Sequence, residues 1–177
     1  MKKKKLVKGF TLVELLAVIA ITGVVGTLMF GILFTTLRGA SKSDSMGTIQ
    51  KNGDFVMSQI SRTIRFASAL DTPSTCYTAP TPTPVVNSSI TVLDGSNRKT
   101  TYACDTTAGT ISSNSAVLLD PNEVVVTACS FSCQQLTPND FPTFTIVITL
   151  NKKDNNSLSE NNSALTFQTS VTMRNVR

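Results

Sequence analysis

An apolar run that begins directly after a lysine-rich start dominates the first quarter of this 177-residue chain. Between Phe10 and Leu37 the only charged residue is Glu14. The run is longer than the roughly 20 apolar residues that an α-helix needs to cross the hydrocarbon core of a bilayer. The sequence therefore predicts a transmembrane helix over residues 10–37.

The charges on either side of this run predict its orientation. The segment before it, residues 1–9, holds five lysines, whereas Arg38 and Lys42 are the first cations after it. Because the more positive flank of a membrane helix stays in the cytoplasm, we expect the chain beyond about residue 40 to be exported. Without those five lysines, the 16 basic residues fall to 11 and balance the 11 acidic ones. The exported part therefore has no basic cluster of the kind that binds nucleic-acid backbone.

Glu14 separates this run from an ordinary export signal. A secretory signal has about 7–15 apolar residues and a small-residue cleavage site, and the run here is longer and lacks an A-x-A site. A plain signal anchor is an alternative, but it leaves unexplained a carboxylate that costs about 2.5–3.5 kcal/mol at the bilayer centre. The nearest cation in sequence would be an α-amine at Phe10, if the chain were cut after Gly9.

The lysine-rich leader, Gly9 and the run Phe10-Thr-Leu-Val-Glu14-Leu-Leu resemble the class III signal of type IV prepilins and type II secretion pseudopilins. The resemblance covers residues 1–40. It implies that prepilin peptidase, a membrane aspartyl peptidase, cuts after Gly9 and methylates Phe10. It also implies that Phe10 and Glu14 take part in subunit assembly, Glu14 through the N-terminus of a neighbouring subunit.

The same resemblance implies a structural subunit rather than an enzyme, with no cofactor and no metal. Its partners would be prepilin peptidase, other pilin or pseudopilin subunits, an inner-membrane assembly platform and the lipid bilayer. The precursor would lie in the bacterial inner membrane, and the filament in the periplasm or at the cell surface. Residues 60–67 and 170–177 are similar to minor pilins and J-type minor pseudopilins, which favours a minor subunit. Gly31 stands where many major pilins have proline, so melting of the helix near Gly23–Gly31 on assembly stays open.

Beyond the membrane run the apolar residues recur at three- and four-residue steps. They form one stripe of an amphipathic helix, and no proline appears before Pro73, so a single helix is predicted from about Thr11 to Ala69. We expect the stripe to pack on the chain's own C-terminal domain rather than on a second protein. Its members are Met46, Ile49, Gly53, Val56, Met57, Ile60, Ile64 and Ala67.

The C-terminal part has the pattern of β-structure. Short runs rich in β-branched and aromatic residues alternate with polar positions, as in half-buried strands, and the segment 94–97 is a hairpin turn signal. We expect an α+β fold of the type IV pilin kind, in which a long N-terminal helix packs on a C-terminal antiparallel β-sheet and the last two strands pair with each other. The predicted strands are 90–93, 99–104, 124–129, 143–150 and 165–173. The predicted regions are a cleaved leader (1–9), a transmembrane and assembly helix (10–37), its amphipathic continuation (38–71) and an exported β-rich domain (72–177).

Four cysteines lie in the exported part, at Cys76, Cys104, Cys129 and Cys133. An oxidising compartment favours disulfides, and four cysteines allow three pairings. We expect Cys129 to pair with Cys133, closing a turn at a strand end, and Cys76 to pair with Cys104. A four-thiolate zinc site is the alternative, although zinc motifs usually show two close pairs.

Two other classes of function stay open at this stage. One is a DNA-uptake or adhesive module displayed on a pilus, for which Arg98-Lys99 and Lys152-Lys153 are the basic pairs of the β-rich part. The other is a membrane-anchored protein that is not assembled, such as a hydrolase that uses a carboxylate pair. Most of the carboxylates fall in predicted turns, and the oxygen-rich segment 154–160 does not match a calcium-binding EF-hand.

Overall fold

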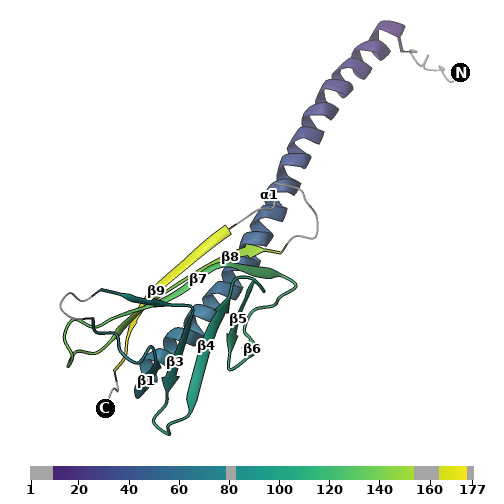
Figure 1. Cartoon of the computed structure of the whole chain (residues 1–177). Coiled ribbons are helices and arrows are strands. Elements are labelled where there is room, and N and C mark those ends of the chain that lie inside the picture. Colours follow the sequence, from purple (N-terminus) through teal and green to yellow (C-terminus); the bar gives the residue numbers. More distant parts are fainter. Residues whose placement is uncertain (1–9, 79–82, 154–163, 175–177) are drawn as a thin grey trace, which may run out of the picture. The chain divides into compact units, whose positions relative to one another are not determined.

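The computed structural model describes residues 10–78, 83–153 and 164–174 (Figure 1). Within these ranges the chain forms one helix and nine strands. The elements are α1 (Leu12–Phe66), β1 (Ala69–Thr72), β2 (Val85–Asn87), β3 (Ser89–Leu93), β4 (Lys99–Asp105), β5 (Thr110–Ser113), β6 (Ala116–Val117), β7 (Val124–Gln134), β8 (Thr143–Lys152) and β9 (Ala164–Thr172). The chain divides into two compact units, residues 1–41 and 42–177.

The described part of the first unit is the N-terminal portion of α1. This helix is long and apolar enough to cross a membrane, by length and composition. Every large apolar residue from Phe10 to Leu37 is exposed. This portion therefore has no protein core of its own, as expected for a segment that lies in lipid or against other helices.

The second unit contains two antiparallel sheets rather than the single sheet that we expected. Sheet A has the order β1-β3-β4-β5-β6, and sheet B has the order β2-β7-β8-β9. The five predicted strands are confirmed as β3, β4, β7, β8 and β9, and the last two pair as predicted. The four remaining strands have two to four residues each, too few for a clear alternating pattern.

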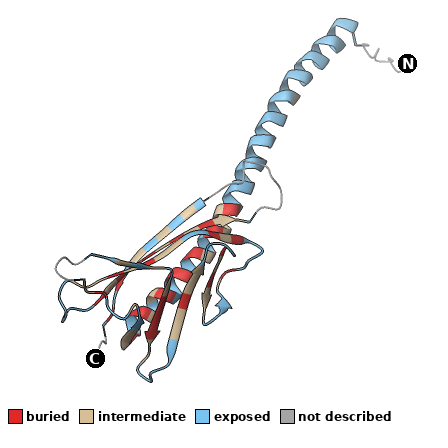
Figure 2. Cartoon of the chain, in the orientation of Figure 1, coloured by how far each residue is buried: buried red, intermediate tan, exposed pale blue. Residues whose placement is uncertain are grey.

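The amphipathic stripe of α1 is confirmed as part of the core (Figure 2). Ile49, Val56, Ile60 and Ile64 are at most 1% exposed and belong to one cluster with the inward residues of both sheets. Met46 is half-buried, and Ser45 takes the buried position beside it, where its hydroxyl accepts a hydrogen bond from Lys152 Nζ at 3.1 Å. The resulting α+β architecture is that of a type IV pilin-like fold.

The helix ends at Phe66, before the predicted limit at Ala69, because the following residues join sheet A. The Ser68 N–H donates to the Leu93 carbonyl at 2.8 Å, and the Ser68 hydroxyl donates to the Asp94 carbonyl at 2.6 Å. β1 begins directly after Ser68 and pairs antiparallel with β3.

The predicted hairpin turn at residues 94–97 connects β3 to β4. Asp94 Oδ1 accepts the N–H groups of Ser96 at 2.8 Å and Arg98 at 3.0 Å, and Asn97 takes a positive φ of 58°. A second tight hairpin, between β5 and β6, has Asn114 and Ser115 at φ 48° and 70°. Positive φ at both central residues is typical of a type I′ turn.

Candidate functional site

The first turn of α1 holds the residues that the class III resemblance singles out. Thr11 precedes the helix, and its carbonyl and its hydroxyl both accept the N–H of Glu14, at 3.1 and 3.3 Å. Thr11 is therefore the N-cap and Glu14 the third helical residue, the spacing of a capping box. A carboxylate here also interacts favourably with the positive end of the helix dipole.

The Glu14 side chain is exposed, and it has no ion-pair partner among the described residues. Phe10, which lies one residue before the N-cap, is 76% exposed. Gly9 and the rest of the leader lie outside the described residues. The helix start thus presents a carboxylate and an aromatic side chain that are both exposed among the described residues.

The capping role of Thr11 was not predicted from the sequence, where Glu14 was interpreted only as a partner for a cation. The signal was present, because a threonine followed three residues later by glutamate at the start of an apolar run is the sequence form of a capping box. Glu14 therefore has a local structural role in addition to any role in assembly.

The four cysteines form two disulfides, as predicted, but with a different pairing. Cys76 bonds to Cys133, and Cys104 bonds to Cys129. The predicted bridge between Cys129 and Cys133 is wrong because both residues lie in the continuous strand β7 rather than at a turn. Four residues of extended strand separate their Cα atoms by about 13 Å, well beyond the roughly 7 Å that a disulfide can span.

The two disulfides connect parts of the fold that no backbone ladder joins. Cys104 lies in β4 of sheet A and Cys129 in β7 of sheet B, so this bridge links the two sheets. Cys76 follows β1 in the chain. Its bridge joins the segment between β1 and β2 to the C-terminal end of β7. All four thiols are used in this way, which excludes the four-thiolate zinc alternative for this oxidised form.

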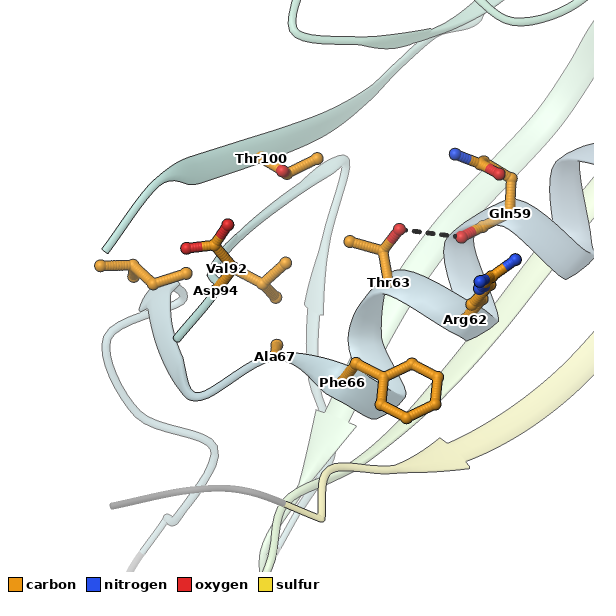
Figure 3. A pocket seen from close by; sticks show the side chains of 9 residues that line it. Gln59, Arg62, Thr63, Phe66, Ala67, Val92, Asp94 and Thr100 are labelled. Atoms are coloured by element: carbon orange, nitrogen blue, oxygen red, sulfur yellow. Dashed lines mark hydrogen bonds between the residues drawn. The ribbon is translucent and has the colours of Figure 1, made fainter. Parts of the chain in front are cut away.

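A hollow of about 330 Å³ lies at the C-terminal end of α1 (Figure 3). Thr63 lies at its wall, donating to the Gln59 carbonyl at 3.0 Å and accepting from the Tyr102 hydroxyl at 2.8 Å. Asp94 is the carboxylate that lines it, and its oxygens accept hydrogen bonds from Ser96 and Arg98. The residues around the hollow are Gln59, Arg62, Thr63, Phe66, Ala67, Val92, Leu93, Asp94 and Thr100.

Three carboxylates of the described β-structure, those of Asp71, Asp94 and Asp120, have structural partners. Asp94 and Asp120 accept backbone N–H groups within their own turns, as the sequence predicted. Asp71 pairs with Lys99 at 2.9 Å, which connects β1 to β4. Among the described residues no cluster of three or more histidine, cysteine, aspartate or glutamate side chains could hold a metal. The oxygen-rich segment 154–160, which we considered for calcium, lies outside the described residues.

Comparison with known proteins assigns the N-terminal segment. Residues 4–30 match the family model of the prokaryotic N-terminal methylation motif. No curated protein and no solved structure matches the chain. Proteins of this motif family are structural rather than enzymatic, and the motif supports a precursor of the type IV pilin or pseudopilin kind that prepilin peptidase processes. The match ends within α1 and therefore leaves the β-rich domain without an assignment.

Proposed function

We propose that the chain is a minor structural subunit of a type IV pilus or of a type II secretion pseudopilus. Prepilin peptidase cuts it after Gly9 and methylates the new N-terminal Phe10. The subunit then assembles with other pilin or pseudopilin subunits through its N-terminal helix, at an inner-membrane assembly platform. Its C-terminal domain, beyond about residue 72, lies on the exported side of the membrane.

The observation that carries this proposal is the methylation motif at residues 4–30, which continues into an apolar helix that has no core of its own. A precursor needs this helix to stay in the bilayer before cleavage. An assembled subunit needs the same surface for contact with other helices. Both needs agree with a segment whose large apolar residues are all exposed.

Glu14 supplies the specificity of assembly in this proposal. Its carboxylate is exposed at the first turn of the helix, and in a low-dielectric environment it favours a cation nearby. Cleavage after Gly9 creates such a cation at Phe10 of every subunit. A contact between Glu14 of one subunit and the Phe10 amine of the next would set the axial stagger between them.

The experiment separates this role from helix capping. Glu14→Gln removes the charge but keeps the size of the side chain, whereas Thr11→Val removes the N-cap hydroxyl but keeps the carboxylate. We expect both variants to be cleaved by the peptidase, as read by the size shift on an immunoblot. The amount of Glu14→Gln recovered in sheared filaments should fall about tenfold, the effect of losing one charged hydrogen bond, and Thr11→Val should stay within about twofold of the unchanged chain.

Equal recovery of Glu14→Gln and the unchanged chain would contradict an ionic contact in assembly. Equal losses in both variants would instead assign Glu14 to helix capping alone. The minor role has its own test, which is the ratio of this subunit to the most abundant subunit in purified filaments. A ratio close to one would contradict it.

A further inference from the structure

Among the described residues, no strand pairs with the outer edge of β9. β9 is the last strand of sheet B and pairs on one side only, with β8. It has nine residues, whereas the other edge strands of the two sheets, β1, β2 and β6, have four, three and two. Figure 1 shows it, in yellow, as a long border strand of the domain.

This edge also lacks the features that usually protect an edge strand from other chains. Proteins place lysine, proline, a bulge or a short strand at such positions. β9 contains no charged residue and no proline, and its pairing with β8 runs without a register shift. The β1–β3 pairing, by contrast, contains such a shift.

The register determines which backbone groups of β9 are available. Met173 donates its N–H to the Pro142 carbonyl at 3.2 Å, on the β8 side. Because bonding and non-bonding positions alternate in an antiparallel ladder, the odd-numbered residues of β9 bond toward β8. The N–H and C=O groups that point away from β8 are those of Ala164, Thr166, Gln168, Ser170 and Thr172.

Three side-chain contacts support the same register independently. Thr172, Ser170 and Thr166 each place a hydroxyl within 2.9–3.0 Å of a threonine hydroxyl across the strand pair. Side chains approach most closely at the non-bonded positions of an antiparallel pair. The outward groups therefore recur at every second residue over about 30 Å, a spacing that fits an extended polypeptide backbone.

The side chains of β9 define the chemistry of the strand that this edge accepts. The even-numbered residues are exposed, and all of them except Ala164 carry polar side chains, whereas Leu165 and Phe167 are half-buried on the other face. The Phe167 ring packs on α1 at Gly53. Over Thr166 to Ser170, an added strand would therefore place polar side chains on the outer face. It would place apolar side chains beside Leu165 and Phe167.

The far end of the edge favours a large apolar residue in the added strand. A hollow of about 480 Å³ lies there, lined in part by Thr172, Leu136 and Phe141, and the last two are 67% and 54% exposed. A residue paired with Thr172 would project on the face that borders this hollow. In an antiparallel pairing centred on Gln168, a second copy of β9 would place the small Ala164 there, which argues against self-pairing.

We propose that the outer edge of β9 is a docking site for an extended, amphipathic strand of a partner protein. The partner strand adds to sheet B through main-chain hydrogen bonds, and its large apolar residue covers Leu136 and Phe141. The proposal does not depend on cleavage or methylation of the N-terminus, so the two accounts can fail separately.

The test uses the full chain in detergent micelles and a labelled synthetic peptide of nine alternating valine and threonine residues that begins and ends with valine. Phenylalanine and lysine flank it on each side, so that each phenylalanine projects on the same face as the threonines. We expect the peptide to bind, and we expect the amides of Thr166, Gln168 and Ser170 to exchange hydrogen more slowly in its presence. Gln168→Pro removes one outward N–H and should weaken binding at least about tenfold. Gln168→Thr keeps that N–H and should bind within about twofold of the unchanged chain.

Two controls separate loss of docking from loss of folding. Proline is tolerated in an edge strand where its missing N–H would face solvent, so Gln168→Pro should keep both disulfides and its melting temperature. If that variant does not fold, the same hydrogen bonds are tested by changing the peptide instead of the protein. A peptide methylated on alternate backbone nitrogens should not bind the unchanged chain. The proposal is overturned by a peptide that does not bind, by equal binding of the methylated peptide, or by equal binding to a folded Gln168→Pro variant. A dimer that this substitution dissociates would assign the edge to a second copy and would also overturn it.

Discussion

Glu14 shows how one residue can have two roles at the start of a membrane helix, one through its backbone and one through its side chain. The N–H of Glu14 is held by Thr11, while its carboxylate stays exposed. The backbone part of this arrangement is local and needs no second subunit. The carboxylate is therefore available for a neighbour without loss of the helix start.

Asp94 gives a prediction for the pH dependence of stability. The N–H groups of Arg98 and Ser96 that bond to its carboxylate lower its pKa below the ordinary value of 3.8. A lowered pKa in the folded state stabilises the fold above the unfolded pKa, and this contribution is lost as pH falls through the folded value. The melting temperature of the unchanged chain should therefore exceed that of Asp94→Asn at pH 7, and the gap should narrow below about pH 3.8. A gap that widens with acid would contradict the assignment.

The backbone conformation and surroundings of Gly109 predict that a larger residue there lowers stability. Gly109 has a φ of 67°, and a β-carbon there would collide with the Val125 side chain. Gly109→Ala should therefore lower the free energy of unfolding by about 1–3 kcal/mol. Gly95→Ala is the matched control, because a β-carbon at Gly95 meets nothing within 4 Å, and it should change stability by less than about 0.5 kcal/mol. Thermal unfolding followed by circular dichroism measures both, and similar losses in the two variants would refute the steric account.

The strands show where the sequence pattern was sufficient and where it failed. β8 and β9 alternate over ten and nine residues, so their pairing could be predicted. β7 continues to Gln134, past the predicted end at Cys129, because Ser130 to Gln134 keep the alternation of buried and half-buried positions. That extension is also the reason for the wrong disulfide prediction, since it turns a presumed bend at Cys129–Cys133 into extended strand.

The two disulfides make a prediction about the stability of the β-rich unit. Closing loops of 57 and 25 residues should contribute about 4 and about 3.5 kcal/mol through the unfolded chain. The double variants Cys76→Ala with Cys133→Ala, and Cys104→Ala with Cys129→Ala, should each lower the free energy of unfolding by amounts of this order. The first pair should cost more, because Cys76 and Cys133 are almost fully buried. Peptide mapping of the oxidised chain checks the pairing itself, and a peptide linking Cys129 to Cys133 would contradict this fold.

At the scale of the whole molecule, the sequence predicted the long helix and the longer strands, but it did not predict the short strands. The apolar run is recognisable by its length. The stripe from Met46 to Ala67 and the five longer strands follow the periods of a half-buried helix and of half-buried strands. β1, β2, β5 and β6 are placed by tertiary contacts, such as the Ser68 hydrogen bonds to the β3 end. The division into two sheets follows from the same contacts, and no local pattern could have predicted it.

The central claim, that this chain is a processed pilin-like precursor, rests on the N-terminal motif and is tested most directly by an intact mass. The protein is purified from its native membranes and weighed with and without reduction. The account predicts a chain that starts at Phe10 and carries one additional methyl group, with a gain of two protons for each of two disulfides on reduction. A mass that retains the lysine-rich leader, or that starts at another residue, would contradict processing after Gly9 and leave a membrane-anchored β-rich protein that is not assembled.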